Sequence, residues 1–155
     1  MKNYLIIGGS TGIGLALVQQ LAVQGHRVYA TYNKTEIVDP LPHVSYHHLD
    51  IMAEKLSFDF LPDTLDGLVY CPGSINLKPF HRIKAAAFVH DFQLQVVGAI
   101  QAIQAALPSM KAVEQASMVL FSTVAVQAGF NFHSQVATSK GAICLLYTSP
   151  SPRDS

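Results

Sequence analysis

Three glycines near the amino terminus have a type and spacing that suit binding of a phosphate group. Gly8 permits a tight turn, Gly12 lets the backbone approach a pyrophosphate, and Gly14 allows a helix to pack closely on a strand. The first turn of that helix would offer free N–H groups and a positive dipole potential to the anion. The alternative is a glycine-rich turn without a ligand. The whole loop reads Gly8-Gly9-Ser10-Thr11-Gly12-Ile13-Gly14.

The elements that position this loop follow from the hydrophobic pattern. Residues 4–7 are a short apolar run, typical of a strand buried on both faces, and residues 13–22 repeat apolar side chains at helical spacing before Gly25. Alternating strands and helices predict an α/β fold with a doubly wound parallel sheet, which binds ligands beyond the carboxyl ends of its strands. Further strands are expected at 27–31, 43–48, 66–70 and 117–122, and further helices at 53–60, at 83–107 before Pro108, and from 135.

Composition narrows the class of protein. The 155 residues include ten basic and ten acidic ones, so the net charge is zero, and half of the chain is apolar. A balanced charge argues against a nucleic-acid partner and favours a small molecule or another protein. The two cysteines, Cys71 and Cys144, lack metal-ligand spacing, and every apolar run is too short for a membrane span. We therefore expect neither a metal nor a membrane partner, and a reducing cytoplasm as the location.

The carboxyl end has a different composition. From Cys144 to Ser155 the chain reads CLLYTSPSPRDS, directly after the first turns of an expected helix. Eleven of these residues match the translation of a transposon-end adapter used in sequencing libraries. We therefore predict that residues 144–155 are a non-native tail and that residues 1–143 are an incomplete nucleotide-binding domain. The alternative is a native, Pro-rich disordered tail.

The G-x-x-x-G-x-G spacing from Gly8 to Gly14 resembles the short-chain dehydrogenase/reductase family, and matches to the family pattern continue in order from Lys2 to Ile143. The resemblance implies a Rossmann-type sheet, here truncated at its carboxyl end after about five strands. It also implies NAD or NADP as cofactor and hydride transfer to or from a small carbonyl, alcohol or activated alkene. Family members form homodimers or homotetramers, which we expect of the full-length protein. The 155-residue chain itself is expected to be inactive.

Further cofactor contacts are implied by the same resemblance. Asp50, followed by Ile51, matches the family's Asp that contacts the adenine; its alternative role is a helix cap. Cys71 and Gly73 lie where the family has Asn-Ala-Gly, so the Gly is retained and the Asn is replaced. Gln95 replaces the Asn of a second family element.

Cofactor choice depends on the residues that follow the second expected strand. These are Tyr32, Asn33 and Lys34. NAD-dependent enzymes usually have an acid there, which binds the ribose diol and repels a 2′-phosphate. Because this position has no acid and one nearby base, the sequence favours NADP over NAD.

The family's catalytic positions are only partly retained. Thr123, beside Ser122, matches the hydroxyl residue that stabilises the developing oxyanion, and Lys140 matches the catalytic lysine. The family places a Tyr four residues before that lysine as the proton donor, and here that residue is Val136.

Two accounts of this missing Tyr remain open. His133 lies seven residues before Lys140, a separation at which enoyl-reductase relatives have a Tyr, and its imidazole is a candidate proton donor. A solvent-facing loop position is the alternative reading of His133. The second account is a protein that binds the nucleotide without turnover.

Overall fold

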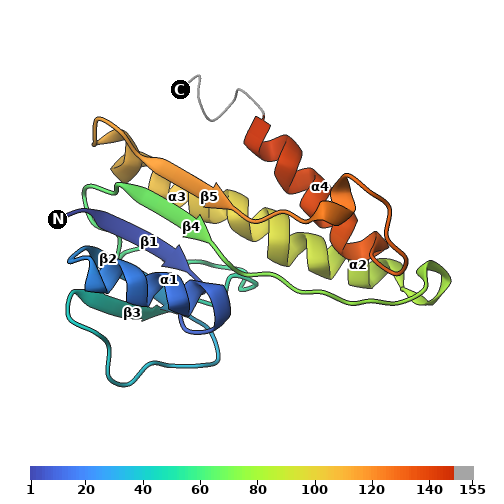
Figure 1. Cartoon of the computed structure of the whole chain (residues 1–155), viewed down its shortest axis with the longest axis horizontal. Coiled ribbons are helices and arrows are strands. Elements are labelled where there is room, and N and C mark those ends of the chain that lie inside the picture. Colours follow the sequence, from blue (N-terminus) through green and yellow to red (C-terminus); the bar gives the residue numbers. More distant parts are fainter. Residues whose placement is uncertain (149–155) are drawn as a thin grey trace. The chain divides into compact units, whose positions relative to one another are not determined.

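The computed structural model describes residues 1–148, which divide into two compact units (Figure 1). The first unit comprises residues 1–72 and 100–119, and the second comprises residues 73–99 together with the chain from residue 120 onward. Residues 149–155 of the predicted tail lie outside the described part of the chain.

The first unit is built on one sheet with the strand order β3-β2-β1-β4-β5. The pairs β1–β2, β1–β4 and β2–β3 are parallel. Because the order reverses at β1, the loops after β1 and β4 open at the same edge of the sheet, where ligands bind in such folds. The strands are β1 (Asn3–Ile7), β2 (Arg27–Tyr32), β3 (Val44–His48), β4 (Gly67–Tyr70) and β5 (Ser117–Leu120).

Strand β1 forms the centre of this sheet, as its apolar run predicts. Leu5 and Ile6 are fully buried, and all four residues of β4 beside it are buried as well. Helix α1 (Gly12–Val23) follows the glycine loop and contacts β1 and β2 (Figure 1). The parallel sheet with flanking helices confirms the predicted fold class.

The expected long helix is longer and less regular than predicted. Residues 85–111 form α2 (Ala85–Phe92), a π-helical turn η2 (Gln93–Val97) and α3 (Gly98–Lys111). Pro108 therefore lies inside α3 and does not end it. Met110, beyond the proline, is buried, so apolar packing offsets the hydrogen bond that Pro108 cannot make.

The prediction of a short helix at 53–60 is wrong, since this segment consists of bends, turns and irregular backbone. The hydroxyl of Ser57 donates to Asp59 Oδ2 at 2.5 Å and accepts from the Asp59 backbone N–H at 3.3 Å. Such local side-chain bonds give the backbone an alternative to helical hydrogen bonds.

The second unit is helical. Besides α2 and η2 it contains two short 3₁₀ turns, η1 (Phe80–Arg82) and η3 (Val124–Val126), and helix α4 (Ser134–Thr148). Helix α4 packs against α2, η2 and η3. It begins one residue before the predicted start and continues into the predicted tail. Within residues 1–148, no helix has the length and apolar content needed to cross a bilayer.

Candidate functional site

The glycine loop turns sharply after β1 and is held by the neighbouring strands. Gly8 has a φ of +77°, which favours glycine, and its N–H donates to Thr31 Oγ1 at 3.0 Å. The Gly9 N–H donates to the Thr31 carbonyl at 2.8 Å, and the Tyr46 hydroxyl donates to the Gly9 carbonyl at 3.1 Å. Backbone groups of the loop's first half are thus paired within the first unit, which fixes its path.

The space available for a side chain differs between Gly14 and Gly12. A Cβ on Gly14 would overlap the carbonyl oxygen of Gly8, so helix and loop approach as closely as the spacing predicts. Gly12 has a φ of +53° and no described atom within 4 Å of where its Cβ would lie. Thr11 caps α1 without a side-chain hydrogen bond, and the first turn holds no acid. Open space beside an uncapped helix end fits a pyrophosphate.

Ile13 lies at the beginning of α1 and is 65% exposed. Leu17 and Leu21, which share its helical spacing, are half-buried, and Gly14 and Val18 are the buried residues of α1. Ser10, by contrast, is buried within the loop. An exposed apolar side chain next to the loop suits contact with a flat, apolar part of a nucleotide.

Asp50 lies beside the carboxyl end of β2. Its Oδ1 accepts from the Met52 backbone N–H at 3.0 Å and from Asn33 Nδ2 at 3.4 Å. The carboxylate therefore caps a turn after β3, although the sequence alternative was the cap of a helix. The neighbouring Ile51 is buried. The structure brings Asp50 and Asn33 together, although they are 17 residues apart.

Glu36 is an acid at this edge that sequence analysis missed. Its carboxylate forms a hydrogen bond with the Tyr32 side chain; desolvation and Glu36 together raise the pKa of that phenol. Lys34 is exposed, as expected of a base that meets solvent or a phosphate. Glu36 follows β2 by four residues, so a wider search for acids after the strand would have found it.

Cys71 follows β4, at the same sheet edge as the glycine loop. Its backbone N–H donates to the Ile7 carbonyl at 3.0 Å. Burial raises the pKa of the Cys71 thiol to about 11, so the group is a neutral thiol at physiological pH. Pro72 lies 3.3 Å from where a Cβ on Gly8 would be, which keeps the two loops in contact. Cys71 therefore lies directly after β4 as a half-buried thiol.

In the second unit, Lys140 and Gln95 meet beside Gly73. A Cβ built on Gly73 would lie 3.4 Å from Gln95 Oε1 and 3.8 Å from Lys140 Nζ. Burial lowers the pKa of Lys140, while the charges of Asp91 and Cys144 act in the opposite direction. Gly73 leaves room for the amide oxygen and the ammonium group on one side of the backbone.

Asp91 is a buried acid in α2 that sequence analysis did not select. Its side chain is 2% exposed and accepts hydrogen bonds from Ser74, Gln95 and Ser139. The sequence did contain a signal for this pair. Asp91 lies four residues before Gln95 in an otherwise apolar stripe, and residues at that spacing share one helix face.

The proposed hydroxyl and imidazole groups have local partners. Thr123 Oγ1 accepts from the Ala125 N–H at 3.3 Å and thereby caps η3, and the hydroxyl of Ser122 lies 3.0 Å from Cys144 Sγ. His133 Nδ1 lies 2.7 Å from the Asn131 carbonyl, which assigns the proton to Nδ1 and leaves Nε2 as the basic nitrogen. Cys144 is the first residue of the predicted tail.

Val136 lies in the first turns of α4 and is 6% exposed. A buried valine offers neither a proton nor an open position to a substrate. The geometry of the second unit therefore supplies a lysine, a hydroxyl residue and an imidazole, but no phenol at this position.

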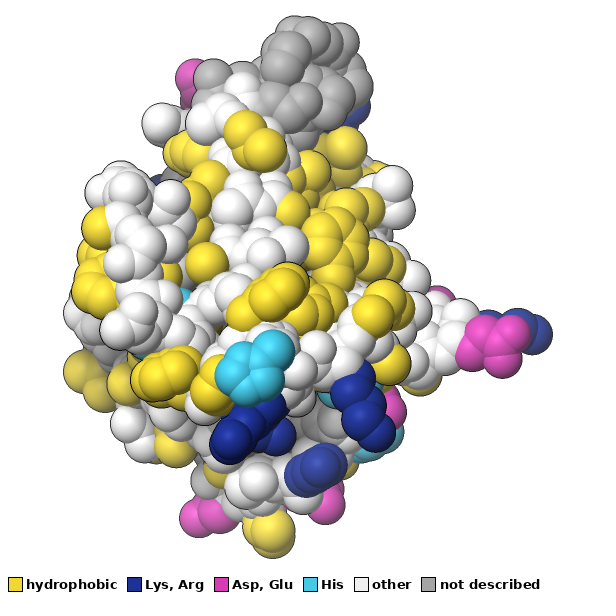
Figure 2. Space-filling model, turned by 90° about the vertical axis from the view of Figure 1, so that its right-hand side faces the viewer, with side chains coloured by type: hydrophobic (Ala, Val, Ile, Leu, Met, Phe, Trp, Pro, Cys, Tyr) yellow, Lys and Arg dark blue, Asp and Glu magenta, His cyan; other side chains and the backbone are white. Residues whose placement is uncertain are grey.

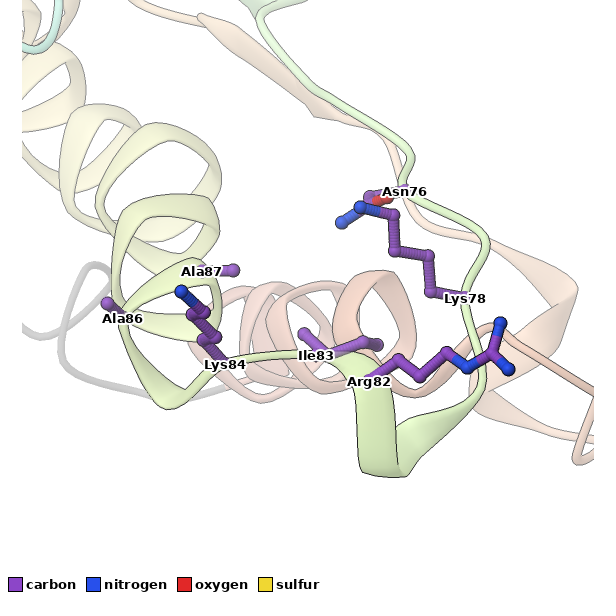
Figure 3. A pocket seen from close by; sticks show the side chains of 7 residues that line it. All are labelled: Asn76, Lys78, Arg82, Ile83, Lys84, Ala86 and Ala87. Atoms are coloured by element: carbon purple, nitrogen blue, oxygen red, sulfur yellow. The ribbon is translucent and has the colours of Figure 1, made fainter.

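A cationic pocket of about 260 Å³ lies at the start of α2. In Figure 3 the Lys78 ammonium lies beside Asn76, whereas the Arg82 guanidinium extends away from Asn76. The space-filling view shows Lys and Arg side chains gathered near hydrophobic ones (Figure 2). Lys84, which precedes the first turn of α2, and Phe80 are both exposed, as is typical of a solvated helix end.

Comparison with known proteins identifies the family. The short chain dehydrogenase family model matches residues 2–151. Human retinol dehydrogenase 8 is 28% identical and the bovine protein of that name 30%, each over 92% of this chain. The reductase MabA of Mycobacterium tuberculosis H37Rv, which acts on 3-oxoacyl-[acyl-carrier-protein], is 26% identical over 92% of the chain and 59% of the relative. The chain spans about half the length of the retinol dehydrogenases, 50% and 51%.

Solved structures show the same fold. A short chain dehydrogenase/reductase family protein has a TM-score of 0.88 at 24% identity, covering 98% of this chain and 68% of its own. A short chain dehydrogenase family protein from Francisella tularensis has a TM-score of 0.85 at 22% identity, covering 97% and 62%. With the glycine loop and the family match over residues 2–151, the conclusion is direct: this chain belongs to the short-chain dehydrogenase family.

Proposed function

We propose that this chain is the nucleotide-binding part of an NAD(P)-dependent oxidoreductase that acts on a small carbonyl, alcohol or activated alkene. The glycine loop carries the proposal, because Gly14 packs against the Gly8 carbonyl while Gly12 and the uncapped end of α1 remain open. The residues that would hold the cofactor are those of the loop, Ile13 included, with Asp50 near the adenine end. The bound nicotinamide would supply or accept the hydride.

The second unit supplies the groups for the rest of the chemistry. The Lys140 ammonium would hold the nicotinamide ribose and lower the pKa of the proton donor. Thr123 or Ser122 would donate a hydrogen bond to the oxygen on which negative charge develops. We assign the remaining role, proton transfer to that oxygen, to His133, because an imidazole can carry and release a proton and Val136 has no acidic group.

A catalytically silent nucleotide-binding protein is the second candidate. It is favoured by the burial of Val136 and by the engagement of Thr123 Oγ1 in capping η3. A non-functional fragment is the third reading, and it applies to the 155-residue chain only. We propose that the natural coding sequence replaces residues 144–155 with a longer segment. Genomic DNA downstream of the Ile143 codon tests this, since a native tail would be encoded there.

His133→Ala separates the first two candidates. In the protein with its natural sequence after Ile143, we expect NAD(P)H oxidation with at least one carbonyl or enone substrate, reduced about 10²-fold or more by His133→Ala. Steady-state rates over a substrate panel provide the measurement. His81→Ala is the matched control, because His81 is an exposed histidine of η1. Tight nucleotide binding without turnover on any substrate would instead establish the silent protein.

Lys34→Glu tests the cofactor preference. We propose that NADP is preferred to NAD because Lys34 is free to meet the 2′-phosphate. Reversing this charge is expected to weaken NADPH binding about ten-fold and to change NADH binding little, since only NADPH carries the added phosphate. Nucleotide fluorescence titration at low salt measures both constants. Tighter binding of NADH than of NADPH by the unaltered chain would contradict the preference and point to Glu36.

We further propose a homodimer or homotetramer in the cytoplasm with a small-molecule substrate. Eight large hydrophobic side chains among the described residues of the second unit before Cys144 are exposed, which favours coverage by another subunit. They are Ile75, Leu77, Phe80, Val89, Phe92, Val124, Phe130 and Phe132.

A further inference from the structure

The carboxylate of Asp91 is the most deeply buried acidic group among the described residues. Ser74 Oγ donates to Oδ1 at 2.6 Å, and Ser139 Oγ donates to Oδ2 at 2.6 Å. Gln95 Nε2 donates to both oxygens at 2.9 Å. These short bonds satisfy a charge that burial alone would make very costly, and they tie α2 to α4 and to the segment after β4.

The same bonds orient the Gln95 side chain. A carboxylate only accepts hydrogen bonds, so it selects the amide nitrogen and leaves Oε1 on the other side. Gln95 Nε2 also donates to the Ser74 carbonyl at 3.2 Å, which reinforces this orientation. Gln95 is 1% exposed, and its Oε1 is buried without a hydrogen-bond partner. The unpaired oxygen therefore lies beside Gly73, on the side where Lys140 Nζ is found.

We propose that Asp91 is a positioning residue of the proposed oxidoreductase: through Ser139 and Gln95 it fixes the surroundings of Lys140, and its negative charge stabilises the buried ammonium group. The proposal rests on the proposed function insofar as Lys140 serves catalysis. The carboxylate offsets the desolvation of the ammonium group, and Ser139 couples Asp91 to the residue next to Lys140 in α4.

The charged groups around Lys140 are few. Asp91 faces it from α2, and Cys144 faces it from α4 itself. His90, the other titratable residue of α2, is exposed, and η2 and η3 contain no titratable side chains. Burial lowers the pKa of Lys140 and Asp91 raises it, so Asp91 is the native group that counteracts burial.

Asp91→Asn tests the proposal because it removes the charge and nearly preserves the shape. The variant is expected to acylate Lys140 about ten-fold faster near neutral pH than the unaltered chain does, since more of the amine is unprotonated. Acetic anhydride over a range of pH, followed by peptide mass spectrometry, gives the titration curve of each lysine. Exposed Lys55 serves as the internal reference. Asp91→Glu, which restores the charge, is expected to restore the slow reaction.

Asp39→Asn removes one charge from an exposed acid and controls for net charge. Thermal melting establishes that each variant is folded; if Asp91→Asn is not, Asp91→Ser removes the charge while leaving room for water. A folded charge-removing variant whose Lys140 titrates as in the unaltered chain would overturn the proposal. The readout needs no nucleotide, so a chain that fails to bind NADPH yet shows the faster acylation contradicts only the proposed function.

Discussion

Gly14→Ala is expected to eliminate measurable NADPH binding and to destabilise the first unit by about 1–3 kcal/mol. The added methyl group would overlap the carbonyl oxygen of Gly8, so either α1 or the loop must move. A displaced loop would no longer present its backbone N–H groups to the pyrophosphate that we propose it binds. Fluorescence titration with NADPH and thermal melting of the same samples measure the two effects.

Two other glycines provide controls for this variant. Gly129→Ala is the matched control, because no described atom lies within 4 Å of its Cβ position and its φ is not positive. Gly12→Ala also meets open space, but its φ of +53° carries a strain of about 1 kcal/mol. It should fold and bind NADPH more weakly. If the Gly14→Ala variant has the melting temperature and NADPH affinity of the unaltered chain, the close packing of Gly14 on Gly8 is not needed for stability or binding.

In the longer protein that we propose, Lys140→Met is expected to lower turnover about 10²-fold or more. Methionine fills a similar volume but cannot hold the ribose or lower the pKa of a proton donor. Steady-state rates at saturating substrate, with NADPH affinity measured separately, distinguish loss of catalysis from loss of binding. Lys55→Met, at an exposed lysine, is the control.

The same variant has a pH signature in stability. Burial makes the Lys140 pKa lower in the folded chain than its ordinary 10.5, so the folded state holds this proton more weakly than the unfolded state does. The resulting penalty is complete below the lowered pKa and disappears as pH rises through the window up to 10.5. Lys140→Met should lack this gain in stability with rising pH. An unchanged pH dependence of melting would mean that the ammonium is hydrated in the folded chain.

Much of the first unit was predictable from local sequence. The run before Gly8 predicts a buried strand because four consecutive apolar residues suit a position covered on both faces, and β1 confirms it. The spacing of Gly8, Gly12 and Gly14 predicts the loop because each position restricts the backbone or the space for a Cβ, and the structure has that close contact. These features depend on residues that are close together in the sequence, so they can be predicted from one sequence alone.

Other features depended on contacts between distant residues. Ile13 shares the helical spacing of Leu17 and Leu21, yet it is 65% exposed while they are half-buried. Pro108 reads as a helix end, yet burial of Met110 continues α3 past it. At Pro108 the local preference against a helix lost to packing, because the free energy of burying an apolar side chain such as Met110 exceeds many local preferences.

The sequence by itself determined the fold class, the glycine loop and the replacement of the family's Tyr by Val136, since each is a matter of residue type and spacing. The tertiary structure alone decided that Asp91 meets Ser139, which lies 48 residues away, and that Gln95 directs its free oxygen toward Gly73. The physical reason is that a buried charge is stable only where several donors converge, and convergence depends on how helices pack.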